Sequence, residues 1–499
     1  MKKTKIVATL GPAVEFRGGK KLGDDGYWGE QLDVEASAQK IAQLITAGAN
    51  VFRFNFSHGD HAEQGARMAT VRRAEEIAGQ KVAFLLDTKG PEIRTELFEG
   101  EAKEYSYKTG DTLRVTTKQG VKSTQEVIAL SVAGSLDVFD DVAVGNFILI
   151  DDGKLALKVI EKDVDKREFV VEAQNDGVIA KQKGVNIPYT KIPFPALAER
   201  DNADIRFGLE QGLNFIAISF VRTAKDVEVV REICRETGND HVQLIAKIEN
   251  QQGIDNIDEI LEAADGIMIA RGDLGVEIPA EEVPIQQKLI IKKCNAASKP
   301  VITATQMLDS MQNNPRPTRA EVGDVANAIF DGTDAVMLSG ETANGKYPVE
   351  SVQMMANICV RTEDFIRSHR AEESLTFAHT STTEAVAQSV VQAATNLDIK
   401  TIVAATSSGS TARKISKYRP YANIVAATFD EKTARSLALV WGVLPYVVDK
   451  PASTDAMIDS ARELAKEKGF VKDGEAIIIT AGVPVAEIGT TNLMKIEMV

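Results

Sequence analysis

The stretch that decides the fold is residues 243–271, QLIAKIENQQGIDNIDEILEAADGIMIAR. Its first and last parts, Gln243–Asn250 and Gly266–Arg271, are short apolar runs rich in isoleucine, which is typical of buried strands. Between them, apolar residues recur at helical spacing over Ile254–Ala264. A strand, a helix and a second strand in this order predict a βα unit of a parallel sheet.

The same alternation of strand and helix extends along the chain in both directions. Eight runs carry the strand pattern: Lys5–Leu10, Val51–Ser57, Val82–Thr88, Phe215–Val221, Gln243–Asn250, Gly266–Arg271, Val301–Thr305 and Ala335–Ser339. Further helical patterns lie between them: Ser37–Ala47, Ala62–Ile77, Lys225–Thr237, Ile285–Ala297 and Arg319–Phe330. Because eight parallel strands with intervening helices close into a barrel, the sequence predicts an α/β protein built on a (β/α)₈ TIM barrel.

One interval, from Gly90 to about Lys191, interrupts this pattern. It lacks helical periodicity and instead shows short alternating segments: Thr112–Thr116, Phe147–Ile150, Leu155–Ile160 and Phe169–Ala173. Prolines flank the interval: Pro91, Pro188, Pro193 and Pro195. We therefore expect an inserted all-β domain that acts as a mobile lid over the barrel mouth.

A second α/β pattern begins at about Ser351. Five runs there have strand character: Thr401–Thr406, Ile424–Thr428, Pro445–Val448, Ala476–Thr480 and Met494–Met498. They predict a separate C-terminal α/β domain. The expected boundaries are 1–90 and 192–350 for the two parts of the barrel, 91–191 for the lid and 351–499 for the C-terminal domain.

The composition excludes several classes of protein. With 44% hydrophobic and 26% charged residues among 499, the chain is neither disordered nor collagen-like. Its net charge of −14 repels nucleic acid and anionic membranes, so neither is expected as a partner. The cysteines, Cys234, Cys294 and Cys359, lack disulfide or zinc spacing, and no signal peptide or membrane span is recognisable. We expect a cytoplasmic protein.

Charged residues gather after the predicted strands, where the working residues of a TIM barrel lie. Glu249 and Asp273 follow two neighbouring strands. Two such carboxylates suit Mg²⁺, which keeps several waters and takes oxygen atoms from a substrate. The alternative is a pair of solvated acids, but the adjacent basic residues favour binding of a metal ion and a phosphate together.

Lys247 lies on the same strand face as Glu249, so an ammonium group and a metal ion can bracket one substrate oxygen. A lysine there stabilises charge on a phosphoryl group or an enolate. The alternative is a salt bridge between Lys247 and Glu249 without a catalytic part. In the next unit, glycines 272 and 275 surround Asp273 and leave backbone N–H groups free to hold a carboxylate or a phosphate.

A second group of strand-end residues offers only oxygen donors and one formal charge: Asn55, Ser57, Asp87 and Thr88. Such a set fits a weakly hydrated monovalent cation better than Mg²⁺. Hydrogen-bonded polar ends of buried strands are an equally open interpretation.

In the C-terminal domain, a hydroxyl-rich loop closes a strand and opens a basic helix. Its residues are Thr406, Ser407, Ser408, Gly409, Ser410 and Thr411. A loop of this kind at a helix N-terminus can cradle a phosphate, although it can also be a simple capping loop. Because it lies in a different domain from the barrel mouth, we expect an effector site there.

Seven stretches are specific enough to indicate a family: Arg53–Gly59, Asp87–Thr95, Lys247–Asn250, Ala270–Pro279, Thr305–Leu308, Arg316–Glu321 and Met337–Thr342. Through them, the chain resembles pyruvate kinase over essentially its full length, in the bacterial form without an extra C-terminal domain. The predicted order of barrel, lid and C-terminal α/β domain is also similar to that of the family.

The resemblance implies transfer of the phosphoryl group of phosphoenolpyruvate to ADP, which gives ATP and pyruvate in glycolysis. Mg²⁺ would bind at Glu249 and Asp273, and K⁺ at the oxygen set. Lys247 and Arg53 would neutralise the phosphoryl group. Gly272, Asp273 and Thr305 would contact the substrate.

The resemblance also assigns the remaining steps. Thr305 would stand beside the enolate as the last member of a proton relay supported by Ser339 and Glu341, because a threonine hydroxyl alone is a poor acid. His58, Arg94 and Lys183 are similar to nucleotide and phosphate contacts. Glu92 is acidic where relatives that work without K⁺ tend to carry a base, so K⁺ dependence is expected.

Two departures from the family pattern concern the nucleotide edge and the effector. The loop Glu15–Gln31 is longer than the usual connection after the first strand. The last loop, Ala481–Thr491, lacks the basic residue that often holds a sugar bisphosphate, so a sugar monophosphate or nucleotide monophosphate is as plausible an effector as fructose 1,6-bisphosphate. A homotetramer is expected from the resemblance.

Two other functions share some of these residues. A Mg²⁺-dependent aldolase or lyase acting on pyruvate enolates would use Glu249 and Asp273 but not the lid lysine or the oxygen set. A catalytically silent sugar-phosphate sensor would use the loop Thr406–Thr411 and would not need Lys247 or Thr305.

Overall fold

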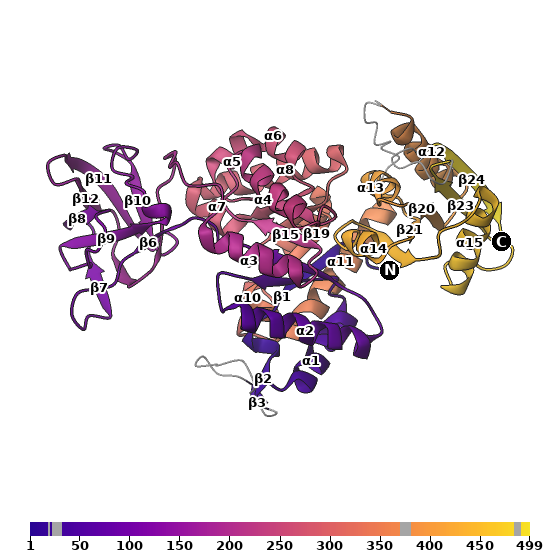
Figure 1. Ribbon diagram of the computed structural model, residues 1–499, viewed down its shortest axis with the longest axis horizontal. Helices are drawn as coiled ribbons and strands as arrows, with labels where there is room; N and C mark the ends of the chain where they lie inside the picture. Colours follow the sequence, from indigo (N-terminus) through magenta and orange to yellow (C-terminus); the bar gives the residue numbers. More distant parts are fainter. Residues whose placement is uncertain (18–19, 22–31, 370–380, 484–490) are drawn as a thin grey trace.

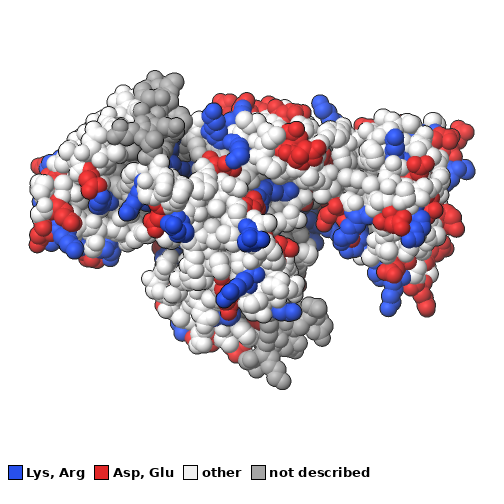
Figure 2. Space-filling model, turned by 180° about the vertical axis from the view of Figure 1, so that it is seen from behind, with Lys and Arg blue, Asp and Glu red and all other residues white. Residues whose placement is uncertain are grey.

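The computed structural model describes residues 1–17, 20–21, 32–369, 381–483 and 491–499. Three domains lie in a row, with the inserted lid at one end, the barrel in the middle and the C-terminal domain at the other end (Figure 1). Basic and acidic side chains are interspersed over the face in Figure 2. No helix among the described residues is long and apolar enough to cross a membrane.

The central domain is a closed barrel of parallel strands in the order β1-β19-β18-β17-β16-β15-β5-β4. Their bounds are β1 (Lys5–Thr9), β4 (Val51–Asn55), β5 (Ala83–Asp87), β15 (Phe215–Ile218), β16 (Gln243–Ile248), β17 (Gly266–Ala270), β18 (Val301–Ala304) and β19 (Ala335–Leu338). All eight predicted runs are confirmed, and so is the TIM barrel.

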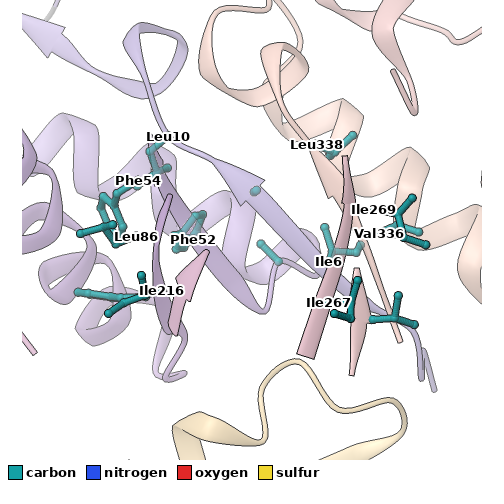
Figure 3. Close-up of a cluster of buried hydrophobic side chains, with 14 of the residues drawn as sticks. Ile6, Leu10, Phe52, Phe54, Leu86, Ile216, Ile267, Ile269, Val336 and Leu338 are labelled. Atoms are coloured by element: carbon teal, nitrogen blue, oxygen red, sulfur yellow. The ribbon is translucent and has the colours of Figure 1, made fainter. Parts of the chain in front are cut away.

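Both faces of these strands are buried, which explains their nearly continuous apolar sequence. Side chains such as Val7, Leu85 and Met268 fill the inside of the barrel. Their neighbours along the strands, such as Ile6 and Leu86, point to the helices that surround the barrel (Figure 3). This alternation turns every second strand residue toward the inside, which brings polar side chains to the mouth at the carboxyl ends.

The surrounding helices agree with most of the predicted ones. They are α1 (Val34–Ala47), α2 (His61–Ala78), α3 (Glu199–Glu210), α4 (Ala224–Glu236), α8 (Val283–Ala297), α9 (Arg319–Asp331) and α11 (Pro348–His369). The single helix expected over 254–264 is wrong. Asn256 divides it into α5 (Gln251–Asp255) and α6 (Ile257–Ala263), because its backbone is not helical and its side chain donates to the carbonyl of Arg222 at 2.8 Å.

The lid is all-β, as predicted, and has a hydrophobic core of its own. Seven of its strands close into a second barrel in the order β10-β11-β12-β8-β9-β6-β14. The lid strands are β6 (Ile93–Thr95), β7 (Glu104–Tyr107), β8 (Thr112–Thr116), β9 (Val127–Val132), β10 (Phe147–Ile150), β11 (Leu155–Asp163), β12 (Glu168–Ala173), β13 (Gly177–Ala180) and β14 (Gly184–Asn186). Strands β7 and β13 form a separate two-stranded ribbon.

The C-terminal domain contains a five-stranded sheet in the order β22-β21-β20-β23-β24, in which only β24 is antiparallel. Its strands are β20 (Thr401–Ala405), β21 (Asn423–Thr428), β22 (Val443–Val447), β23 (Ala476–Ala481) and β24 (Leu493–Met498). Helices α12 (Thr382–Asn396), α13 (Ser410–Lys417), α14 (Glu431–Ser436) and α15 (Thr454–Glu467) complete it. The predicted C-terminal α/β domain is confirmed.

The barrel and the C-terminal domain share a packed interface. Leu439 of the C-terminal domain belongs to the cluster that fills the inside of the barrel. Lys5 on β1 donates to the carbonyl of Val443 at 2.6 Å, and Arg435 forms an ion pair with Glu75 at 2.7 Å. The C-terminal domain therefore covers the end of the barrel opposite the mouth.

Two short strands, β2 (Phe16–Arg17) and β3 (Lys20–Lys21), lie within the predicted long loop Glu15–Gln31. The rest of that loop lies outside the described residues. Glu15 itself is buried and forms an ion pair with Arg67 at 2.7 Å.

Candidate active site at the barrel mouth

Lys247 lies at the centre of the charged groups at the barrel mouth. Its ammonium nitrogen lies 3.0 Å from Oδ1 of Asp87, 2.9 Å from Oε1 of Glu249 and 2.8 Å from Oγ of Ser219. Burial alone would lower the pKa of Lys247, but the carboxylates of Asp87 and Glu249 outweigh this effect and raise it. The salt bridge with Glu249 on which the alternative interpretation depended is present, and the ammonium stays charged.

Arg53 brings a second cation to the mouth. Its Nε lies 2.6 Å from Oδ2 of Asp87, and its Nη1 donates to the hydroxyl of Thr9 at 3.1 Å. Burial alone would raise the pKa of Asp87, but the neighbouring cations Arg53 and Lys247 hold it below its usual value. Asp87 thus lies between Arg53 and Lys247, and it fixes the distance between their positive charges.

Glu249 and Asp273 supply the two carboxylates expected to bind a metal ion. Glu249 follows β16 and is 1% exposed, and its Oε2 accepts the backbone N–H of Phe220 at 2.6 Å. Asp273 belongs to the short helix α7 (Arg271–Glu277) that follows the neighbouring strand β17. Burial raises the pKa of Glu249, and the charge of Asp273 adds to this effect. A bound cation would relieve this excess of negative charge.

The described residues contain no group of three or more His, Cys, Asp and Glu side chains placed to hold a metal ion. Two protein carboxylates with oxygen atoms from substrate and water are a coordination that Mg²⁺ accepts. The three cysteines are buried and free, as expected from their spacing.

The oxygen set comes together where β4 and β5 end. Asn55 and Asp87 are directly paired residues of these strands, and Oδ1 of Asn55 accepts the backbone N–H of Ser57 at 3.1 Å. Thr88 follows Asp87 and is 2% exposed. The paired amide of Asn55 and carboxylate of Asp87, each followed closely in the chain by a hydroxyl residue, fit a cation that needs many weak oxygen ligands.

Sequence reasoning missed Ser219, although it lies at a strand end like the predicted residues. It follows β15 and is 4% exposed. Its hydroxyl donates to the carbonyl of Thr88 at 2.6 Å and lies 2.8 Å from Lys247, while its N–H donates to the Thr88 hydroxyl at 3.0 Å. Ser219 therefore connects Lys247 with the oxygen set.

Thr305 follows β18 and faces the first turn of α7. Its Oγ1 accepts the backbone N–H of Gly272 at 2.7 Å and donates to the carbonyl of Ala304 at 2.6 Å. One strand further on, Oε2 of Glu341 accepts the N–H of Ser339 at 2.7 Å, and its Oε1 accepts the N–H of Leu308 at 3.0 Å. Burial raises the pKa of Glu341.

A cleft of about 570 Å³ lies between the lid and the barrel. Arg94 and Lys183 line it from the lid, and Asp273 and Glu277 line it from the barrel. Asn186 at the end of β14 donates to Oε1 of Glu277 at 2.7 Å, which connects the two walls. The cleft is large enough for a nucleotide-sized ligand and combines both signs of charge.

The sequence matches two family models: "Pyruvate kinase, barrel domain" over residues 1–352 and "Pyruvate kinase, alpha/beta domain" over residues 384–497. The chain belongs to the pyruvate kinase family. A pyruvate kinase of Lactococcus lactis is 65% identical over 100% of this chain and 99% of its own length. One from Lactobacillus delbrueckii subsp. bulgaricus is 54% identical over 100% of this chain and 81% of its own length.

Solved structures agree with these sequence matches. A crystal structure of a pyruvate kinase from Cryptosporidium parvum has a TM-score of 0.88 and 38% identity, and the match covers 100% of this chain and 96% of that one. Membership of the pyruvate kinase family confirms the predicted resemblance. It also confirms that the chain is a phosphotransferase of the kinase class with ADP or ATP as co-substrate.

Among the expected nucleotide contacts of this pyruvate kinase family member, Arg94 and Lys183 line the cleft and His58 does not. Arg94 donates to the carbonyl of Gln182 at 2.8 Å, next to Lys183, which forms an ion pair with Asp151 at 3.3 Å. His58 is exposed at the end of β4 and does not line the cleft. Partial desolvation and the charges of Arg53 and Arg94 lower the pKa of His58.

The expected effector loop lies between β20 and α13. Gly409, with φ of 80°, donates its N–H to the hydroxyl of Thr406 at 2.9 Å and precedes the first residue of α13. Ser407 and Ser408 are exposed at the tip, and Thr411 shares a 2.8 Å hydrogen bond with Thr491. The segment 484–490 of the last loop, which includes Glu487, lies outside the described residues.

Proposed function

We propose that this pyruvate kinase family member transfers the phosphoryl group of phosphoenolpyruvate to ADP at the barrel mouth, forming ATP and pyruvate in glycolysis. The observation that carries the proposal is the position of the Lys247 ammonium, 3.0 Å from Asp87 and 2.9 Å from Glu249. An enclosed, permanently charged ammonium beside two carboxylates is suited to hold a dianionic phosphoryl group when a metal ion occupies the carboxylates.

Two cations are part of the proposal. Glu249 and Asp273 would hold Mg²⁺, which supplies positive charge to the substrate's carboxylate and phosphoryl oxygens. The carboxyl of Glu249 is buried, and burial raises its pKa, so a bound cation would stabilise its ionised form; this supports the assignment of Mg²⁺ to these residues. K⁺ would bind at the oxygen set and supply further positive charge to the site; the residues that would hold it are Asn55, Ser57, Asp87 and Thr88.

The protein's own cations complete the phosphoryl site. Lys247 and Arg53 would contact phosphoryl oxygens and neutralise the charge that the group carries between donor and acceptor. Because Asp87 and Ser219 hold these side chains in place, little reorganisation is needed when the group moves. Gly272 and Asp273, in the first turn of α7, would position the substrate's carboxylate end.

The enolate left after transfer needs a proton at carbon. Thr305 would deliver it as the last member of a relay that begins at Ser339 and Glu341. Burial raises the pKa of the Glu341 carboxyl, which favours its protonated form and so suits a proton donor to the relay.

The lid, with expected bounds 91–191, would close on ADP. Arg94 and Lys183 would contact phosphates in the cleft, and His58 would approach the nucleotide from the barrel rim. Closure would exclude water and so favour transfer to ADP over hydrolysis. The barrel segments 1–90 and 192–350 would carry the chemistry.

The C-terminal domain, 351–499, would bind a phosphorylated effector at the loop Thr406–Thr411. The exposed tip at Ser407 and Ser408 and the helix that follows support this role.

A homotetramer is also proposed. Within the described part of the chain, the edge strand β24 is paired on one side only, and it exposes Met494, Ile496 and Met498, which suits burial against another subunit. The buried free cysteines support a cytoplasmic location.

The test is an assay of pyruvate and ATP formation from phosphoenolpyruvate, ADP and Mg²⁺, with K⁺ compared with a tetraalkylammonium salt. Equal amounts of pyruvate and ATP, formed faster with K⁺, are expected. Cleavage of a pyruvate aldol without nucleotide would instead support the lyase. No turnover, together with binding of a sugar phosphate to the folded protein, would support the sensor.

A further inference from the structure

The backbone just after β18 is strained at two consecutive residues. Thr305 has φ of 69° and Gln306 has φ of 53°, so both lie in the left-handed region. A β-branched residue such as threonine is a genuine outlier there, and such strain persists only where surrounding groups hold it. The strain sets the direction of the Thr305 hydroxyl, so the groups that hold this turn are of functional interest.

The guanidinium of Arg271 holds the turn. Its Nη2 donates to the carbonyl of Thr305 at 2.8 Å and lies 2.7 Å from the sulfur of Met307, and its Nε donates to the carbonyl of Ala304 at 3.2 Å. These three acceptors are spread over four consecutive residues of the strained segment. A planar guanidinium with several fixed N–H directions can hold such a segment, whereas a lysine ammonium cannot reproduce all the bonds.

Arg271 is itself anchored from behind. Its Nη1 lies 2.7 Å from Oδ1 of Asp324 on α9 and 3.3 Å from Oε1 of Gln287 on α8. Its side chain is 11% exposed. All three nitrogens of the guanidinium are engaged within the protein, so Arg271 is a positioning group and not a substrate contact.

The hydroxyl of Thr305 depends on the same segment. It donates to the carbonyl of Ala304, which is also an acceptor for Arg271, and it accepts the N–H of Gly272, the residue next to Arg271. The arginine and its neighbour therefore fix both hydrogen-bond partners of the hydroxyl. A shift of the turn would move the hydroxyl without touching Lys247, Glu249 or the oxygen set.

We propose that Arg271 is a positioning residue for the protonation step, because it holds the strained turn that carries the Thr305 hydroxyl. This inference rests on the proposed function. In that step a C–H bond forms at the terminal carbon of the enolate while the O–H bond of the relay breaks. The electron pair of the C=C bond takes up the proton, the enolate oxygen becomes the ketone, and the relay regains its proton from water.

The test compares two rates on the same full-length enzyme. Formation of ATP from phosphoenolpyruvate and ADP reports phosphoryl transfer. Exchange of the methyl protons of pyruvate with D₂O, followed by proton NMR with Mg²⁺, K⁺ and ATP present, reports proton transfer at carbon. Enolpyruvate that leaves the enzyme becomes pyruvate in solution, so ATP formation continues when protonation on the enzyme is impaired.

The variants are Arg271→Met, which removes the bonds to the carbonyls, and Arg271→Lys, which keeps the charge and part of the donor capacity. Thr305→Ala is the reference for loss of the hydroxyl. Arg231→Met is the matched control, because Arg231 is also a half-buried arginine of the barrel domain that bonds a carboxylate, Asp265, and a backbone carbonyl, that of Ala263. Thermal unfolding is recorded for each variant.

For Arg271→Met, we expect methyl exchange to fall by about 30-fold or more, while ATP formation falls by less than about fivefold and KM for phosphoenolpyruvate changes by less than about twofold. Arg271→Lys should regain part of the exchange, and Arg231→Met should keep the wild-type ratio of the two rates. If Arg271→Met does not fold, the inference is tested by the ratio of methyl exchange to ATP formation in Arg271→Lys.

Two results would overturn the inference while leaving the proposed function intact. The first is a parallel fall of exchange and ATP formation in both Arg271 variants, which would indicate a general structural role. The second is methyl-proton exchange at the wild-type rate in both Arg271 variants, together with loss of this exchange in Thr305→Ala. A wild-type protein with neither activity would contradict the proposed function and this inference together.

Discussion

The ammonium of Lys247 lies 3.0 Å from the carboxylate of Asp87, although their strands are not neighbours in the barrel. Lys247 lies on β16 and Asp87 ends β5, with β15 between them. Ser219, at the end of β15, bridges the gap with a 2.8 Å contact to Lys247. Three consecutive strands are thus joined at the mouth by one buried cation, and this cation connects the carboxylates proposed to hold Mg²⁺ to the oxygen set proposed to hold K⁺.

Replacing Lys247 by methionine removes this cation while keeping most of the length of the unbranched side chain. We expect kcat to fall by roughly three or more decades, because a main cation of the transition state is lost, with Mg²⁺ binding largely intact. Steady-state assays and Mn²⁺ titration, with Mn²⁺ as the probe for the metal site, give the two quantities. Lys293→Met on the outer surface of α8 is the control, and near-normal kcat in Lys247→Met would remove its assigned role.

Ser57→Ala removes one hydroxyl from the oxygen set without touching Glu249 or Asp273. We expect the K⁺ concentration for half-maximal activity to rise about tenfold, because one neutral oxygen ligand is worth about 1.4 kcal/mol at such a site. The Mg²⁺ dependence should stay within about twofold. Ser131→Ala in the lid is the control, and equal changes in both ion dependences would contradict a separate K⁺ site.

Gly90 begins the connection to the lid and leaves no room for a side chain. A Cβ there would lie 2.7 Å from Cδ2 of Phe220 and 2.8 Å from Cβ of Ser219, with φ of 76°. Gly120 in the lid has a similar φ of 75°, but a Cβ there meets nothing within 4 Å.

The two glycines form a matched pair for alanine substitution. Gly120→Ala should cost about 1 kcal/mol from backbone strain alone, whereas Gly90→Ala should cost about 2–4 kcal/mol because overpacking is added. Gly90→Ala should also lower kcat by displacing Ser219 next to Lys247. Thermal unfolding and kcat of both variants decide the matter, and equal losses would mean that the close contacts are unimportant.

Lys5 at the interface with the C-terminal domain predicts a pH dependence of stability. Burial lowers its pKa to about 7 in the folded protein, from 10.5 in the unfolded chain. Between these values the unfolded chain binds a proton that the folded protein has lost, so stability rises with pH by about 1.4 kcal/mol per unit.

Lys5→Met removes this contribution and isolates it from all other titrations. The stability of the wild type relative to Lys5→Met should therefore increase between about pH 7 and pH 10, and should be constant below pH 7. Thermal midpoints of both proteins across this range give the difference. A difference that does not change with pH would show that Lys5 is not deprotonated at this interface.

The barrel strands could be predicted because both of their faces are buried and their sequences are almost purely apolar. Helix α3 could not, because Asp201 and Asp204 on its buried side break the apolar pattern. Asp201 is buried to accept the N–H groups of Lys89 and Gly90 at 3.0 and 3.3 Å, a long-range contact that periodicity does not reveal. Short lid strands such as β14 are set by their partners in the sheet and carry little pattern of their own.

The charged residues of the site could be predicted because acids and bases at strand ends are conspicuous. Ser219 and Thr9 are ordinary hydroxyl residues, and their roles become visible only through their contacts with Lys247 and Arg53. Inspecting the ends of all eight strands, including the first and fourth, would have found both. The left-handed backbone at Thr305 and its support by Arg271 depend on tertiary packing, and no local signal predicts them.

The most direct test of the central claim follows the phosphorus atom itself. In a phosphorus NMR experiment, the folded protein is mixed with phosphoenolpyruvate, ADP, Mg²⁺ and K⁺, and Lys247→Met is run in parallel. We predict that the phosphoenolpyruvate signal disappears in the wild type as the γ-phosphate signal of ATP grows by an equal amount, with little change in the variant. Accumulation of inorganic phosphate in place of ATP, an unchanged phosphoenolpyruvate signal, or equal ATP formation by the variant would contradict the account.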